Sequence, residues 1–181
     1  MRLFRKADGP LRRRALAWLM IAGVAFGLRL LAAWITGAFS HPQLYEYDEI
    51  ARSLLAGRGF TYIFHGIPYH SFEAPLYPWI CAAVYALTGG STGVLLVVQM
   101  VAQAATAVLI AMIGERLFNR SAGIASGLLV ACHPGLIVCA SLKAHALTFD
   151  ALCFSIVLWQ FLKLQDDRTL RQSLWTGLAV G

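Results

Sequence analysis

The amino-acid sequence predicts an all-α protein: a polytopic bundle of transmembrane helices whose first extracytoplasmic loop contains short interfacial helices. Hydrophobic residues form 59% of the 181-residue chain and charged residues only 13%, about half the charged share of a soluble domain. The apolar residues also gather in stretches long enough to cross a bilayer, which takes about 20 helical residues. The lipid bilayer is therefore the first partner that the sequence predicts.

The distribution of positive charge orients the first of these stretches. The net charge is +6, and residues 1–14 hold six basic side chains: Arg2, Arg5, Lys6, Arg12, Arg13 and Arg14. Such clusters mark the cytoplasmic side of a span. We therefore expect a cytoplasmic segment at 1–14, a retained signal anchor at 15–36 and an extracytoplasmic loop at 37–73. The basic residues flank a span and form no stripe on a folded domain, so we expect no nucleic-acid partner.

Arg29 lies inside the first apolar stretch, near its outer end. We expect its side chain to snorkel to the membrane surface or to pair with a carboxylate.

The rest of the chain alternates between apolar stretches and short polar breaks. After a stretch at 74–87 we expect spans at 94–113, at 122–139 with a bend at Pro134, and at 147–164, and then the first part of another at 173–181. Residues 15–181 thus read as the N-terminal part of a longer transmembrane domain, truncated at Gly181. If 74–87 is a full span, Arg116 and Arg120 lie outside. If it is only half inserted, which its short length allows, both arginines stay in the cytoplasm, as the positive-inside rule favours.

The loop carries three carboxylates at the start of a short amphipathic helix: Glu46, Asp48 and Glu49. Its apolar side is formed by Ile50, Leu54 and Leu55, and glycines 57 and 59 end it. A well-placed carboxylate can act as a general base that takes the proton of an attacking hydroxyl group. The alternative is that these acids only complement the helix dipole.

The surrounding pattern resembles that of a known family. It reads Tyr45-Glu46-x-x-x-Ile50-Ala51-Arg52-Ser53-Leu54-x-x-Gly57-Arg58-Gly59-Phe60, then Gly66-x-Pro68 and Ala74-Pro75-Leu76-Tyr77-Pro78. It is similar to bacterial membrane glycosyltransferases related to the dolichyl-phosphate-mannose–protein mannosyltransferases and to the lipid A aminoarabinose transferase. The resemblance implies their C-type glycosyltransferase fold, an acidic catalytic motif in the first outer loop and a polyprenyl-phosphate-linked sugar donor.

The sequence differs from the usual family pattern at one place. Many members carry an Asp-Glu pair several residues before the Ile-Ala-Arg element, where this chain has residues 41–44, His-Pro-Gln-Leu. Others have a Glu four residues before the Ile, which corresponds to Glu46. The resemblance thus supports Glu46 as the catalytic base and leaves Asp48 as a local competitor, with Glu49 beside them.

Further residues are candidates for substrate binding. The forks of Arg52 and Arg58 match phosphate geometry, although both could instead meet lipid headgroups. His65 and His70 could hold the sugar or the phosphate. Together with the carboxylates they could also bind a divalent cation, but their spacing fits no defined metal motif, so we expect no metal and no other cofactor.

A second acidic candidate is Asp150. The resemblance implies an acidic residue just inside the span that follows the short loop 143–146. An ionisable residue in an apolar stretch suggests a functional site. Lys143, seven residues earlier, would lie two turns back on the same helical face, and His145 could approach too. The alternative is a structural ion pair at a helix end.

These observations favour a hexosyl- or pentosyltransferase in the bacterial cytoplasmic membrane. It would move a sugar from a polyprenyl-phosphate donor to a hydroxyl of a protein, lipid or glycan on the outer face. A second hypothesis is a transporter or flippase-like component with Arg29, Asp150 and Lys143 in a polar pathway. A third is an inactive truncated remnant. The long acidic loop favours the enzyme, since transporters place ionisable groups near the membrane midplane.

Overall fold

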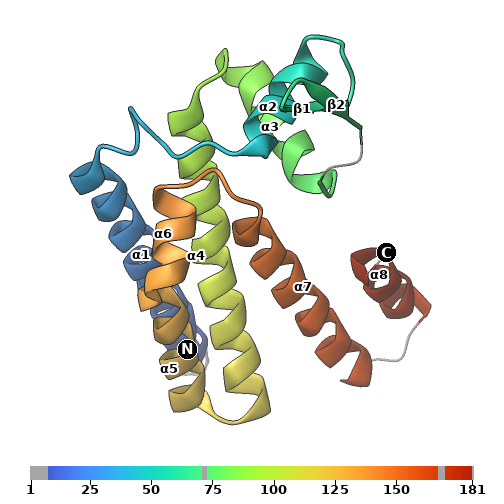
Figure 1. Ribbon diagram of the computed structural model, residues 1–181. Helices are drawn as coiled ribbons and strands as arrows, with labels where there is room; N and C mark the ends of the chain where they lie inside the picture. The colour runs from blue at the N-terminus through green and yellow to red at the C-terminus, as the bar shows by residue number, and fades with distance from the viewer. Residues whose placement is uncertain (1–7, 71–72, 167–169, 181) are drawn as a thin grey trace.

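The computed structural model describes residues 8–70, 73–166 and 170–180, and most of these residues are helical (Figure 1). The elements in chain order are α1 (Asp8–Thr36), α2 (Glu46–Leu55), β1 (Tyr62–Phe64), β2 (Ile67–Tyr69), α3 (Leu76–Thr88), α4 (Thr92–Leu117), α5 (Arg120–Cys132), α6 (Pro134–Ser141), α7 (Leu147–Asp166) and α8 (Leu170–Val180). The expected all-α fold is confirmed, and the antiparallel hairpin β1–β2 is an addition that the sequence did not predict.

Three of the described helices are long and apolar enough to cross a membrane by themselves. They are α1, α4 and α7, with 25, 26 and 20 residues in their candidate spans. Helices α5 and α6 together form a fourth candidate, broken by a bend of 51°. The bend falls where Pro134 removes a backbone donor, as expected. The protein is therefore a multi-pass membrane protein.

The length of helix α3 bears on the choice between the two topologies. Its 13 residues measure about 20 Å, which is short of the roughly 30 Å of a hydrocarbon core, so the stretch at 74–87 does not form a complete span. It packs against α2 at one end of the bundle, together with the hairpin (Figure 1). The length of α3 therefore favours the arrangement with one crossing, along α4, between Pro75 and Arg116.

The opposite end of the bundle gathers basic side chains. Arg14 of α1 pairs with Glu115 of α4 at 3.1 Å, and Arg116 pairs with Asp166 at the end of α7. Arg120 donates to the backbone carbonyl of residue 13. We call this the basic end, and the end with residues 37–70, 73–75 and 142–146 the loop end. Residues 13 and 14 share one end with Arg116, as the half-inserted arrangement predicts.

Arg29 behaves differently from the expectation. It is fully buried, and its guanidinium donates to the carbonyls of Ala25 at 2.8 Å, Ala131 at 3.0 Å and Val130 at 3.4 Å. Pro134 has no N–H to give to the carbonyl four residues earlier, so the break before α6 leaves acceptors that the guanidinium satisfies. The side chain therefore pins α1 to the bent span. It does not snorkel, and among the residues that the structure describes it pairs with no carboxylate.

Glycines bring α4 and α5 into close contact. A Cβ on Gly123 would lie 2.6 Å from the carbonyl oxygen of Ala111 and 2.7 Å from the backbone nitrogen of Glu115. A Cβ on Gly127 would lie 2.8 Å from the Cβ of Ala111. Small residues at such positions let two membrane helices approach backbone to backbone. This antiparallel pair forms the frame that carries the turn 142–146 to the loop end.

Candidate active site

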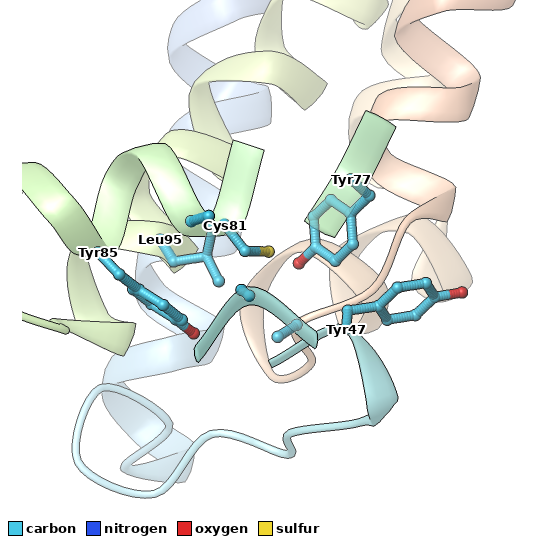
Figure 2. Close-up of a cluster of buried hydrophobic side chains, with 8 residues drawn as sticks. Tyr47, Tyr77, Cys81, Tyr85 and Leu95 are labelled. Atoms are coloured by element: carbon cyan, nitrogen blue, oxygen red, sulfur yellow. The ribbon is translucent and has the colours of Figure 1, made fainter. Parts of the chain in front are cut away.

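The site begins with the way α2 lies on α3. Tyr47 of α2 belongs to one buried cluster with Tyr77, Cys81 and Tyr85 of α3, and its ring lies on the Tyr77 side of that cluster (Figure 2). The Tyr47 and Tyr77 rings meet edge to face with their centroids 5.0 Å apart. This contact fixes the N-terminal turn of α2, with its three carboxylates, above the start of α3.

The expected apolar side of α2 is only partly realised. Ile50 is fully buried and Leu54 packs against the same cluster, whereas Leu55 remains 49% exposed. The buried face of α2 therefore covers α3, and Leu55 lies largely outside this contact.

Asp48 is held by two other side chains. Its Oδ1 accepts a hydrogen bond from the hydroxyl of Tyr85 at 2.6 Å, and its Oδ2 accepts one from Nε of Arg52 at 2.9 Å. The Arg52 guanidinium in turn lies over the Tyr85 ring, 5.0 Å from its centroid. Asp48 is nearly buried, so this charge-assisted set ties α2 to α3. Of the three carboxylates, Asp48 is the one with both oxygens bound to protein donors.

Glu46 forms a pair with a carboxyl group that the sequence analysis missed. Glu73, just before α3, is half-buried and hydrogen-bonds to both Glu46 and Tyr47. Burial raises the pKa of Glu73 above its ordinary value, and the hydrogen bond and charge of Glu46 raise it further. Two adjacent carboxyl groups favour a state in which they hold one proton between them. No local signal marks Glu73, because a single acid before the Ala-Pro pair that opens the next apolar stretch has no distinctive spacing.

Tyr47 joins this carboxyl pair. Burial, followed by the charges of Glu73 and Glu46, raises the pKa of Tyr47 to about 12, so its hydroxyl stays protonated and serves as a donor. The charge of Asp150 makes a further, smaller contribution to this rise in the pKa of Tyr47.

The turn 142–146 forms the facing wall. It is bound to the loop after α1 by two backbone hydrogen bonds. The backbone N–H of Gln43 donates to the carbonyl of Leu142 at 2.8 Å, and the backbone carbonyl of Gln43 accepts from the N–H of Ala144 at 2.9 Å. This brings Nζ of Lys143 to 5.8 Å from the Tyr45 ring centroid. The His145 ring lies 5.8 Å from the rings of both Tyr45 and Tyr47. Residues about 100 positions apart in the chain thus meet at the first turn of α2.

Asp150 and Lys143 are related differently from the sequence prediction. Helix α7 begins at Leu147, so Lys143 precedes it and does not share a helical face with Asp150. Asp150 is exposed in the first turn of α7, where its backbone N–H donates to the carbonyl of Ala146 at 3.0 Å. Both residues nevertheless lie at the loop end.

The remaining candidates belong to the hairpin and its surroundings. Glu49 accepts from the N–H of Ile63 at 3.0 Å and so ties α2 to β1. The His65 ring lies 4.3 Å from that of Phe64, and Nδ1 of His70 is 3.2 Å from the hydroxyl of Thr61. Arg58 is exposed in the segment between α2 and β1. In the part of the chain that the structure describes, no three His, Cys, Asp or Glu side chains converge as metal ligands.

The family of the chain follows from a comparison with known families. The family described as dolichyl-phosphate-mannose-protein mannosyltransferase matches residues 72–181, well over half of the chain. The chain belongs to this mannosyltransferase family. No curated protein and no solved structure matches it. The membership confirms the resemblance drawn from the sequence, and it implies glycosyl transfer from a polyprenyl-phosphate-linked sugar.

The matched segment divides the site in two. Glu73, Lys143, His145 and Asp150 lie within the residues that match the mannosyltransferase family, whereas α2 with Glu46 precedes them. The contacts of Tyr47 with Tyr77 and of Glu46 with Glu73 join the two parts.

Proposed function

We propose that the chain transfers a sugar from a polyprenyl-phosphate donor to a hydroxyl acceptor, at a site formed by the first turn of α2, Glu73 and the turn 142–146. The observation that carries the proposal is the Glu46–Glu73 carboxyl pair facing a cationic turn. The pair supplies a proton acceptor, and the turn supplies positive charge for a leaving phosphate. A general base and a counter-charge for the leaving group are what this reaction needs.

In the proposed reaction Glu46 is the base. It takes the hydroxyl proton as the acceptor oxygen attacks the anomeric carbon of the sugar, and the bond from that carbon to the phosphate oxygen breaks with inversion. The phosphate leaves as an anion, and Lys143 with His145 would bind it. Glu73 is the second carboxyl group of the pair. Asp48 anchors α2 through its hydrogen bonds with Tyr85 and Arg52. Arg58 remains a candidate for contact with lipid headgroups.

The arrangement does not support the transporter hypothesis. Arg29 is occupied by three backbone carbonyls, and Lys143 and Asp150 lie at the loop end next to α2. A polar pathway would need ionisable groups near the membrane midplane.

We also propose that the loop end faces the outside of the bacterial cytoplasmic membrane, since basic residues favour the cytoplasmic side. Ala56, which directly follows α2 at the loop end, is exposed. With the four native cysteines replaced by Ala, Ala56→Cys is expected to react with an impermeant thiol reagent in intact cells. Phe118→Cys, at the basic end and 77% exposed, should react only after the membrane is opened. The reverse pattern would contradict the proposed orientation.

A second test concerns the carboxyl pair itself. The pKa of Glu73 is raised from its ordinary 4.5, so the folded protein binds that proton more tightly than the unfolded chain. The resulting stability is complete below about pH 4.5 and is lost as the pH rises through the raised pKa. Glu73→Gln is always neutral and is expected to flatten this fall, measured as the thermal unfolding temperature across the acidic to neutral range. Glu49→Gln, which also removes one loop carboxylate, is the control, and equal curves for Glu73→Gln and wild type would contradict the pairing.

A further inference from the structure

We propose that Gln99 of α4 is a positioning residue for the phosphate-binding side of the site. It acts by holding the turn 142–146 in place against α2 and α3. This inference rests on the proposed function, because it assigns to the turn the task of meeting the donor phosphate. Gln99 itself touches no reacting group.

The side-chain amide of Gln99 is engaged on both of its polar atoms. Its Nε2 donates to the carbonyl of Lys143 at 2.7 Å and to that of Ala140 at 3.5 Å. Its Oε1 accepts from the N–H of His145 at 3.2 Å and from the hydroxyl of Tyr77. An amide has two donor hydrogens and two acceptor lone pairs, and here all four have partners.

The backbone partners fix which way the amide points. A carbonyl such as that of Lys143 can only accept and the N–H of His145 can only donate, so the flipped amide would lose both bonds. Gln99 is fully buried, where an unpaired amide would be costly. The turn is therefore bound in a single register relative to α4.

The same amide reaches both walls of the site. Through Lys143 and His145 it grips the backbone of the cationic turn. Through Tyr77 it fixes the ring that packs on Tyr47, next to the carboxyl pair. Loss of these bonds would let the turn shift relative to α2, and displacements near 1 Å are enough to weaken a positioned site strongly.

Gln103 provides a matched control one helical turn further along α4. It too is fully buried, but its Nε2 makes only a longer bond of 3.4 Å, to the carbonyl of Thr148, and its Oε1 has no partner among the described residues. Replacing Gln103 therefore removes a buried amide from the same helix without releasing the turn.

The experiment compares Gln99→Leu, Gln99→Glu and Gln103→Leu in the full-length protein reconstituted in nanodiscs. Gln99→Glu covers the case in which Gln99→Leu fails to fold. It keeps the acceptor for Tyr77 and His145 but replaces the donor to Lys143. Thermal unfolding identifies the folded variants. Hydrogen–deuterium exchange of peptides covering residues 142–147 then reports the turn, and titration with a polyprenyl phosphate that carries no sugar reports phosphate binding.

We expect both Gln99 variants to exchange faster in the turn and to bind polyprenyl phosphate about tenfold or more weakly. With a sugar-loaded donor, the loss should appear in KM more than in kcat, and Gln103→Leu should match wild type in each measurement. If wild type binds polyprenyl phosphate and the folded Gln99 variants bind it equally well, or exchange in the turn is unchanged, the inference is overturned and the proposed function stands. If wild type itself does not bind the lipid, the proposed function fails, and the inference fails with it.

Discussion

Replacing Glu46 with Gln is expected to lower kcat for sugar transfer by about 10²–10⁴-fold, the usual contribution of a general base. The change keeps the size of the side chain and its ability to hydrogen-bond to Glu73, but it removes the proton acceptor. The Gln side chain still has Glu73 as a hydrogen-bonding partner, and the ring contact of Tyr47 with Tyr77 does not involve residue 46. The thermal unfolding temperature should therefore stay near that of wild type. Specific activity of the full-length variant tests the expected loss of kcat, and its thermal unfolding tests the expected unchanged stability.

Asp48→Asn is the informative comparison. Asp48 accepts hydrogen bonds from Tyr85 and Arg52, so its loss should lower the unfolding temperature together with the activity. Two variants on the same helical turn would then separate a chemical role from an anchoring role. If Glu46→Gln keeps near wild-type activity while a well-folded Asp48→Asn loses it, the base is Asp48 and the assignment given above is wrong.

A single added methyl group at Gly123 is expected to lower the free energy of unfolding by about 1–3 kcal/mol, as overpacking of a tight interface does. In Gly123→Ala the new Cβ would lie 2.6 Å and 2.7 Å from backbone atoms of α4. Neither atom can rotate away as a side chain would, so α4 and α5 must move apart. Thermal unfolding in detergent, followed by size-exclusion chromatography, measures the loss.

Gly23→Ala makes the same chemical change where there is room. A Cβ at Gly23 of α1 would meet no atom within 4 Å, and alanine is the better helix former. This control should unfold at or above the wild-type temperature. Equal stability of the two variants would show that α4 and α5 are not packed as closely as described.

The sequence predicted the spans well because their signal is local. Residues 94–113 and 147–164 are continuous apolar stretches, and the bend at Pro134 follows from a missing N–H. Arg29 was wrongly expected to snorkel, since the carbonyls that hold it belong to residues 130 and 131. Only the packing of α1 on α5 brings them within reach.

The site was predicted only in part for the same reason. The acidic cluster and the pair Lys143 and His145 could be named from residue type, but nothing local shows that they meet. Their meeting depends on the bond between Gln43 and the turn and on the amide of Gln99 inside a span. Glu73 escaped notice because a lone acid before a Pro-containing helix start has no distinctive spacing. Its role becomes visible only beside Glu46.

The backbone bond between Gln43 and the turn 142–146 has a consequence for synthesis. The loop after α1 leaves the ribosome about 100 residues before the turn that it binds, and α4, α5 and α6 must all be inserted before the turn can arrive. Until then Tyr45 and Tyr47 have no His145 to pack against, and Lys143 is not beside them. A nascent chain that stops short of residue 142 therefore carries the acidic first turn of α2 but lacks the turn 142–146, which forms the other wall of the proposed site.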